Sequence, residues 1–210
     1  MTRIALIHAL IDSMEPATAA FARDWPDADL VHLLDSSLSQ DVARPDRAAG
    51  IAGRIHALSR YAQDIGSDAI LFTCSAFGPA IDAARDGLSI PVRKPSEAVI
   101  REATELGGRI ALVATFAPTL RTMPCEFPPD ARILPVLAEG ALEALKQRHP
   151  AQHDAQIAQA AKQAGCDVVV LAQFSSARAA EAVRKVFHGP VLTTPGAAVR
   201  DLRECLMARR

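Results

Sequence analysis

The second half of this sequence repeats the first. Residues 66–72 (GSDAILF) align with residues 165–171 (GCDVVVL), and the apolar run at 3–7 (RIALI) matches the run at 109–113 (RIALV). A repeat whose period is about half the chain indicates two similar lobes, and it excludes a solenoid of short units.

Short apolar runs alternate with alanine-rich segments along both halves. The runs are rich in Ile, Val and Leu and do not alternate with polar residues, which is typical of strands buried on both faces of a parallel sheet. The segments between them have helical spacing. This order predicts an α/β fold in which parallel sheets are flanked by helices. The expected strands are 3–9, 30–34, 69–73, 90–93, 109–114, 132–137, 168–172 and 191–193, and the main expected helices are 46–65, 96–106, 155–164 and 197–207.

The repeat also predicts the division of the chain. We expect lobe 1 at residues 1–94 and lobe 2 at residues 95–195, with a C-terminal helix at 196–210 that packs back on lobe 1. A pseudo-twofold axis between the lobes would put equivalent strand-end loops on opposite walls of one cleft. Because parallel sheets bind ligands at the carboxyl ends of their strands, the predicted active site lies in that cleft.

The composition indicates what kind of molecule the protein binds. The chain has 23 Lys and Arg against 24 Asp and Glu, a formal net charge of -1, so it lacks the basic excess of a nucleic-acid-binding protein and a small molecule is expected instead. No apolar run approaches the roughly 20 residues of a membrane span, and the first residues do not resemble a signal peptide. We therefore expect a cytoplasmic protein with no membrane partner.

The four cysteines, Cys74, Cys125, Cys166 and Cys205, are widely spaced. They show no metal-ligand spacing, and the histidines of the second half add none, so we assign no metal and expect four free thiols. Cys74 differs in its position, because the sequence 70–79 (ILFTCSAFGP) predicts a buried strand that ends at this cysteine and continues into a helix. Unpaired amides and the helix dipole at such a junction favour a thiolate, which makes Cys74 the first catalytic candidate. Its alternative is an inert buried thiol.

Together these features resemble the aspartate/glutamate/hydantoin racemase superfamily, which also contains arylmalonate decarboxylase and maleate isomerase. The resemblance rests on the repeat, on TCS at 73–75, on AT at 114–115 with Thr119, and on TPGAA at 194–198 before the last helix. It implies an enzyme without metal or organic cofactor that moves a proton at the carbon next to a carboxylate. It also implies one cysteine from each lobe, acting on opposite faces of that carbon.

The chain departs from this two-cysteine pattern. The repeat aligns Gln173 with Cys74, and an amide is neither an acid nor a base at neutral pH. His8 ends the first strand near the place where the racemases carry an aspartate. We expect His8 to orient or deprotonate Cys74 or to act as the second base, the alternative being a buried imidazole whose hydrogen bonds are satisfied.

Hydroxyl groups are expected at several helix starts. Ser75, Thr115 and Thr119 are predicted to cradle the substrate carboxylate and the enediolate formed from it, and helix capping is their alternative role. Gln173, Phe174 and Ser175 are the expected substrate contacts of the second lobe, where capping and core packing are again the alternatives.

The sequence thus predicts a cofactor-independent isomerase or racemase that acts on a small carboxylate, with Cys74 as acid and base. A decarboxylase of malonate-type acids that needs a single thiol is the enzymatic alternative, and a non-catalytic carboxylate-binding protein is the third possibility. A homodimer is the expected assembly.

Overall fold

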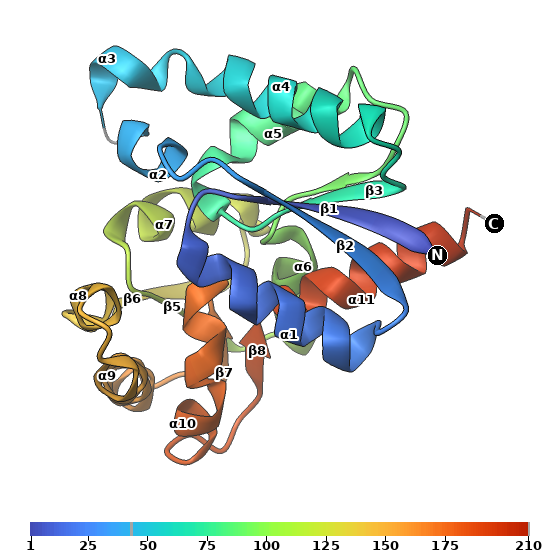
Figure 1. The fold of residues 1–210 in the computed structure, drawn as a ribbon. Helices are drawn as coiled ribbons and strands as arrows, with labels where there is room; N and C mark the ends of the chain where they lie inside the picture. The colour runs from blue at the N-terminus through green and yellow to red at the C-terminus, as the bar shows by residue number, and fades with distance from the viewer. Residues whose placement is uncertain (43, 210) are drawn as a thin grey trace. The chain divides into compact units, whose positions relative to one another are not determined.

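The computed structural model describes residues 1–42 and 44–209, which form two compact units (Figure 1). Unit 1 comprises Met1–Pro95 and Ala198–Arg210, and unit 2 comprises Ser96–Ala197. Each unit contains one four-stranded sheet in which all strands are parallel, so the predicted α/β fold with two helix-flanked parallel sheets is confirmed. Within the described ranges, no helix has both the length and the apolar character needed to cross a bilayer.

Unit 1 is built around a sheet with the strand order β2-β1-β3-β4. In the register, Ile7 of β1 pairs with Leu33 of β2 and with Phe72 of β3. The elements are β1 (Thr2–His8), η1 (Ile11–Ser13), α1 (Met14–Asp24), β2 (Ala28–Leu34), α2 (Leu38–Asp41), α3 (Pro45–Ala48), α4 (Ile51–Asp64), β3 (Ala69–Phe72), η2 (Ser75–Phe77), α5 (Gly78–Arg85), β4 (Val92–Arg93) and, from Ala198 onward, α11 (Thr194–Met207).

Helices cover both faces of the unit 1 sheet (Figure 1). Helices α4 and α5 lie on one face, where Ile55 and Ile81 pack against Ile7, Ile70 and Phe72 in one buried cluster. Helix α1 and the unit 1 part of α11 lie on the other face. Because successive residues of a strand point to opposite faces, each residue next to a member of this cluster in β1 or β3 points toward α1 and α11.

Unit 2 repeats this plan with the strand order β6-β5-β7-β8. Helices α6 and α7 pack against Ile110, Leu112 and Val170, whereas α9 and α10 pack against Val113 and Leu171 on the other face. The elements are α6 (Glu97–Leu106), β5 (Arg109–Ala114), α7 (Ala117–Thr122), η3 (Met123–Glu126), β6 (Arg132–Leu137), α8 (Ala141–Lys146), α9 (Pro150–Gln163), β7 (Val168–Leu171), η4 (Ser175–Ala179), α10 (Ala180–Arg184) and β8 (Val191–Thr193).

The same hydrogen-bonded clamp begins the central strands of both sheets. In unit 1 the backbone N–H of Arg3 donates to Asp68 Oδ2 at 2.7 Å, and the backbone N–H of Asp68 donates to the Arg3 carbonyl at 2.8 Å. In unit 2, Arg109 and Asp167 make the same two bonds, each at 2.8 Å. The sequence repeat is therefore also a repeat of local structure.

All eight expected strands are present, with ends that shift by up to two residues. The expected helix at 46–65 is two helices, α3 and α4, separated at Gly50, the residue that precedes α4. Gly50 occupies the amino-terminal cap position of α4, where glycine is acceptable.

Candidate active site

Cys74 is the second residue after β3, at the carboxyl end of a central strand of unit 1. Its backbone is extended (φ -122°, ψ 122°), and η2 begins at the next residue, Ser75. The half-buried side chain packs against the cluster that contains Ile7 and Phe72. The structure therefore has the strand-to-helix junction that the sequence predicts.

The environment of Cys74 nevertheless differs from the expected one. Burial raises the pKa of the Cys74 thiol to about 11, and a hydrogen bond with the backbone of Ala76 opposes this shift only in part. The junction predicts a stabilised thiolate, but the loss of solvation outweighs the amide and helix-end contributions. Cys74 is consequently a neutral thiol at pH 7, suited to donating a proton.

His8 and Cys74 point to opposite faces of the sheet. Ile7 and Phe72 belong to the cluster that Cys74 contacts, so the alternation of side chains directs His8 and Thr73 toward α1 and α11. The described hydrogen-bond partners of the His8 ring are Ser13, Thr73 and His32, and a role of His8 at the Cys74 thiol stays a prediction.

Both nitrogens of the His8 ring have other partners. Nδ1 lies 2.9 Å from Thr73 Oγ1 and 3.2 Å from Ser13 Oγ, and Nε2 lies 2.9 Å from Nδ1 of His32. Burial of this fully enclosed ring, together with the nearby His32, lowers the pKa of His8 to about 4. Burial also lowers the pKa of His32. Both rings are therefore neutral at pH 7.

In unit 2 the residue aligned with Cys74 forms a side-chain link to the loop after β5. Gln173 Oε1 accepts hydrogen bonds from the backbone N–H of Thr115 at 2.6 Å and from its hydroxyl at 3.0 Å. A backbone N–H can only donate, so this contact fixes which end of the amide is oxygen. Both donors of Thr115 thus point to Gln173 in this structure, and its role in cradling a substrate carboxylate stays a prediction.

The other predicted substrate contacts follow the carboxyl ends of β3, β5 and β7. Ser75 opens η2, and Thr119 lies buried in α7. Phe174 is fully buried and Ser175 is the first residue of η4. None of the helices or 3-10 helices that begin at these loops has a side-chain cap hydrogen bond, so the capping alternative is not realised there.

Sequence reasoning missed His32. It lies in β2, where Leu6 is its register partner, and it reaches His8 two residues further along β1. The available signal was a polar side chain inside an otherwise apolar strand run, but only the pairing of β1 with β2 connects that side chain to His8.

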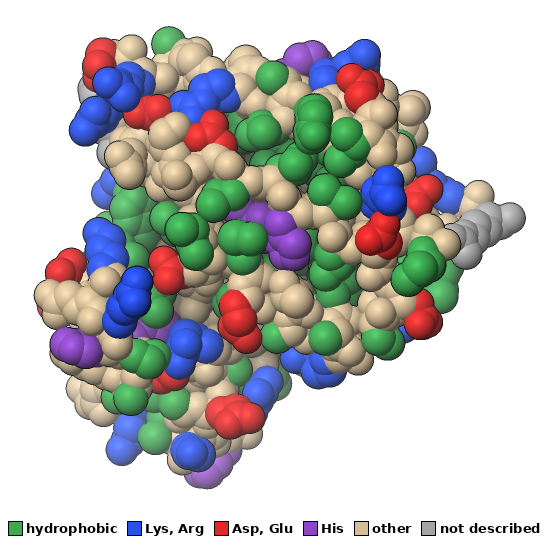
Figure 2. Space-filling view, in the orientation of Figure 1, with side chains coloured by type: hydrophobic (Ala, Val, Ile, Leu, Met, Phe, Trp, Pro, Cys, Tyr) green, Lys and Arg blue, Asp and Glu red, His purple; other side chains and the backbone are tan. Residues whose placement is uncertain are grey.

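No metal site competes with this interpretation in the described part of the chain, where no three His, Cys, Asp or Glu side chains are grouped to hold an ion. On the face shown in Figure 2, acidic and basic side chains are interspersed.

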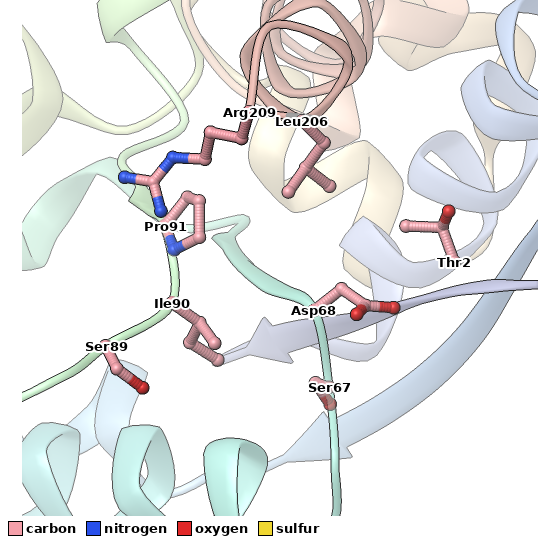
Figure 3. Close-up of a pocket in the computed structure, with 8 residues that line it drawn as sticks. All are labelled: Thr2, Ser67, Asp68, Ser89, Ile90, Pro91, Leu206 and Arg209. Carbon is pink, nitrogen blue, oxygen red and sulfur yellow. The ribbon is translucent and has the colours of Figure 1, made fainter.

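A cavity of about 230 Å³ lies in unit 1 between the amino ends of β1 and β3 and the end of α11, and is lined by Thr2, Asp68 and Arg209 among others (Figure 3). It lies at the opposite ends of these strands from Cys74 and does not belong to the candidate site.

The chain matches the model of a known protein family. The model of the Asp/Glu/Hydantoin racemase family matches residues 9–121, which is more than half of the chain. This segment contains Cys74, Ser75, Thr115 and Thr119. No curated protein matches the sequence.

Solved structures share the fold over nearly the whole chain. Allantoin racemase from Klebsiella pneumoniae is similar with a TM-score of 0.70 and 21% identity, over 99% of this chain and 89% of that one. A glutamate racemase isoform from Bacillus anthracis has a TM-score of 0.73 and 14% identity, over 99% and 82% of the two chains. A variant of arylmalonate decarboxylase, in a form associated with a sulfate ion, has a TM-score of 0.63 and 18% identity, over 96% and 92%.

Proposed function

Because the chain belongs to the Asp/Glu/hydantoin racemase family, we propose that this racemase-like enzyme transfers a proton at a carbon next to a carboxylate or a carboxylate-like group, without a cofactor. Cys74 is the proposed proton-transferring residue. The observation that carries this proposal is the position of its thiol, at the carboxyl end of a central strand and in contact with the backbone of Ala76.

The chemistry follows from the protonation state of Cys74. The neutral S–H delivers its proton to the carbon of an enediolate, the C–H bond forms as the S–H bond breaks, and a thiolate remains. In the reverse direction that thiolate takes the proton from the substrate carbon. Burial makes the thiolate of Cys74 less stable than its neutral thiol, so the thiolate is a strong base once it has formed.

Gln173 is proposed to stabilise negative charge. Thr115 holds its Oε1, so the Nε2 end of the planar amide is left with two N–H donors. Donors aimed at an oxygen that gains charge stabilise the enediolate more than the substrate, which is how a hydrogen-bonding group accelerates such a reaction. Thr115 then acts as the residue that positions Gln173.

Decarboxylation is the second candidate, and a specific observation favours it. Racemisation requires one group to remove a proton and another to deliver one, whereas Gln173 does neither. In a decarboxylation the C–C bond breaks, carbon dioxide leaves, and the electron pair stays on the enediolate carbon. One neutral thiol such as Cys74 then suffices to protonate that carbon, and water returns the proton to sulfur.

Isotope exchange tests both candidates. The wild type is incubated in deuterated water with allantoin, hydantoins, glutamate, aspartate and, separately, phenylmalonate, and products are read by mass spectrometry. We expect deuterium at the α-carbon of one substrate, or carbon dioxide release from phenylmalonate. Cys74→Ala should lose the activity by about a thousandfold, while Cys125→Ala, which removes an exposed thiol, should retain it.

The possible results of that experiment distinguish the proposed functions. Exchange without carbon dioxide release supports the isomerase, and carbon dioxide release supports the decarboxylase. A Cys74→Ala variant as active as the wild type would falsify the assignment of Cys74. Ligand-induced thermal stabilisation without any turnover would overturn the enzymatic proposal in favour of a binding protein.

A further inference from the structure

A buried chain of side-chain hydrogen bonds joins two loops at the carboxyl edge of the unit 1 sheet. Ser13 ends η1 in the loop after β1, and Thr73 begins the loop after β3. Their hydroxyl oxygens lie 3.0 Å apart, and both face Nδ1 of His8. Ser13, Thr73 and His8 are at most 4% exposed, so water does not share these bonds.

The donors along this chain indicate the direction of its shortest bonds. The Ser13 hydroxyl donates to the Leu10 carbonyl at 2.7 Å, so toward Thr73 its oxygen is the acceptor. When the Thr73 hydroxyl donates to Ser13, its own oxygen accepts the N–H of His8 Nδ1 at 2.9 Å. His8 Nε2 is then an acceptor and needs a proton from outside. The Nδ1–H of His32, 2.9 Å away, supplies it.

The opposite order satisfies fewer contacts. If the Thr73 hydroxyl donated to His8, two oxygens with no proton between them would face each other at 3.0 Å, because the Ser13 proton points to Leu10. The order that ends with a proton from His32 places a hydrogen in each of the three shortest side-chain contacts, Ser13–Thr73, Thr73–His8 and His8–His32. His32 is therefore the residue that completes the network.

Unit 2 shows that the fold does not require this network. By strand register, Ala114 stands in place of His8, Ala172 in place of Thr73, and Pro135 in place of His32. The backbone bond is nevertheless kept, from Thr73 to Ile7 at 3.1 Å and from Ala172 to Val113 at 2.9 Å. Unit 2 thus forms the same sheet with apolar side chains at these places, and buried polar groups without a role are a cost.

We propose that His32 is a positioning residue, which with His8 clasps the loop after β1 to Thr73 and so fixes the backbone from which Cys74 projects. This inference rests on the proposed role of Cys74. His32 acts through the chain and does not touch the thiol, because the network lies on the face of the sheet opposite to Cys74. An error of about 1 Å in the position of a reacting atom costs about a hundredfold in rate, so holding Thr73 is sufficient reason for the network.

Two pairs of variants test whether His32 and Thr73 hold the two loops together. His32→Leu removes the donor, whereas His32→Asn keeps an amide N–H near the place of Nδ1. Thr73→Val removes the hydroxyl at nearly constant shape, whereas Thr73→Ser keeps it. The matched control is Ser59→Ala, which deletes another buried hydroxyl of unit 1, one that donates to the Ile55 carbonyl inside α4.

Hydrogen exchange of the amides at residues 73–75 is the first readout, since it needs no substrate. His32→Leu and Thr73→Val should speed exchange there by tenfold or more. His32→Asn, Thr73→Ser and Ser59→Ala should leave it near the wild-type rate. Equal exchange in His32→Leu and Ser59→Ala overturns the proposal, whether or not a substrate for the enzyme has been found.

Turnover of a substrate that passes the isotope test is the second readout. His32→Leu should lower kcat by about 10 to 100-fold with less than a threefold change in KM, and His32→Asn should restore most of the loss. The double variant of His32→Leu and Thr73→Val should be no slower than either single one, because both break the same chain. Additive losses, or a kcat unchanged in His32→Leu, contradict the proposal even if Cys74 is shown to be catalytic.

Discussion

Gln173 Oε1 lies 2.6 Å from the backbone nitrogen of Thr115 and 3.0 Å from its hydroxyl oxygen. The residue that the repeat aligns with Cys74 therefore forms a hydrogen-bonded link to a neighbouring loop.

Loss of this link should destabilise the protein. In Gln173→Ala the buried N–H of Thr115 has no acceptor, so we expect the free energy of unfolding to fall by about 1 to 3 kcal/mol in urea titrations. Gln173→Glu keeps an acceptor and should stay within about 1 kcal/mol of the wild type. As a control, Gln147→Ala removes an exposed side-chain amide at the carboxyl-terminal cap of α8. It should change the free energy of unfolding by less than about 0.5 kcal/mol. A Gln173→Ala variant as stable as this control contradicts the prediction.

Lowering the pH should lower the free energy of unfolding through protonation of His8. Its pKa is about 4 in the folded protein against 6.5 for the free group, so the unfolded chain binds the proton more readily and stability falls as the pH drops from 6.5 to 4. Above pH 6.5 the full contribution is present, and the loss amounts to about 3 kcal/mol at pH 4.

Urea titrations at several pH values check this dependence. A His8→Gln variant should show a flatter decline between pH 6.5 and 4 than the wild type, whereas His56→Gln, at an exposed histidine of α4, should follow the wild type. Parallel curves for the wild type and His8→Gln would show that His8 does not carry the effect.

The raised pKa of Cys74 makes its labelling slow at neutral pH. With a pKa of about 11, roughly one thiol in ten thousand is ionised at pH 7, and the thiolate is the form that iodoacetamide attacks. We expect the exposed Cys125 to be labelled first, and the rate at Cys74 to rise with pH up to about 11. Peptide mass spectrometry over a pH series measures both rates. Selective labelling of Cys74 below pH 7 would mean that its thiolate is stabilised after all.

An ion pair ties the last helix to the sheet of unit 1. Arg93 Nε at the end of β4 lies 2.7 Å from Asp201 Oδ2 in α11, and both side chains are largely shielded from solvent. Asp201→Asn should lower the free energy of unfolding by about 1 to 3 kcal/mol and speed hydrogen exchange in the 198–207 segment. Glu204→Gln, at an exposed site of the same helix, is the control. Unchanged exchange in Asp201→Asn would show that the pair does not hold the helix.

Much of the fold is predictable from the sequence because the strands are short, apolar and separated by clear helical segments. The eight strands follow from their runs of Ile, Val and Leu, and the repeat predicts two sheets of the same plan. The division of one expected helix at Gly50 was missed because an isolated glycine is compatible with a continuous helix as well as with a cap.

The candidate site was predictable only in part. The position of Cys74 at the end of β3 follows from local sequence, but the direction of its side chain relative to His8 depends on how β1 and β3 pair. Likewise the bond from Thr115 to Gln173 and the contact of His8 with His32 join residues on different strands or loops. All three relationships depend on which strands pair across a sheet, and that pairing joins residues far apart in the sequence.

Unit 2 is one continuous segment, whereas unit 1 takes residues from both sides of it. Arg203 of α11 donates to the Asp24 carbonyl at 2.8 Å. Together with the Arg93–Asp201 pair, this bond joins α11 to α1 and β4, which precede unit 2 in the chain. On the ribosome, unit 2 therefore emerges whole while unit 1 still lacks its last helix. The lobe that is synthesised first is the one that is completed last, and a chain stalled before residue 198 carries the Cys74 loop on an unfinished lobe.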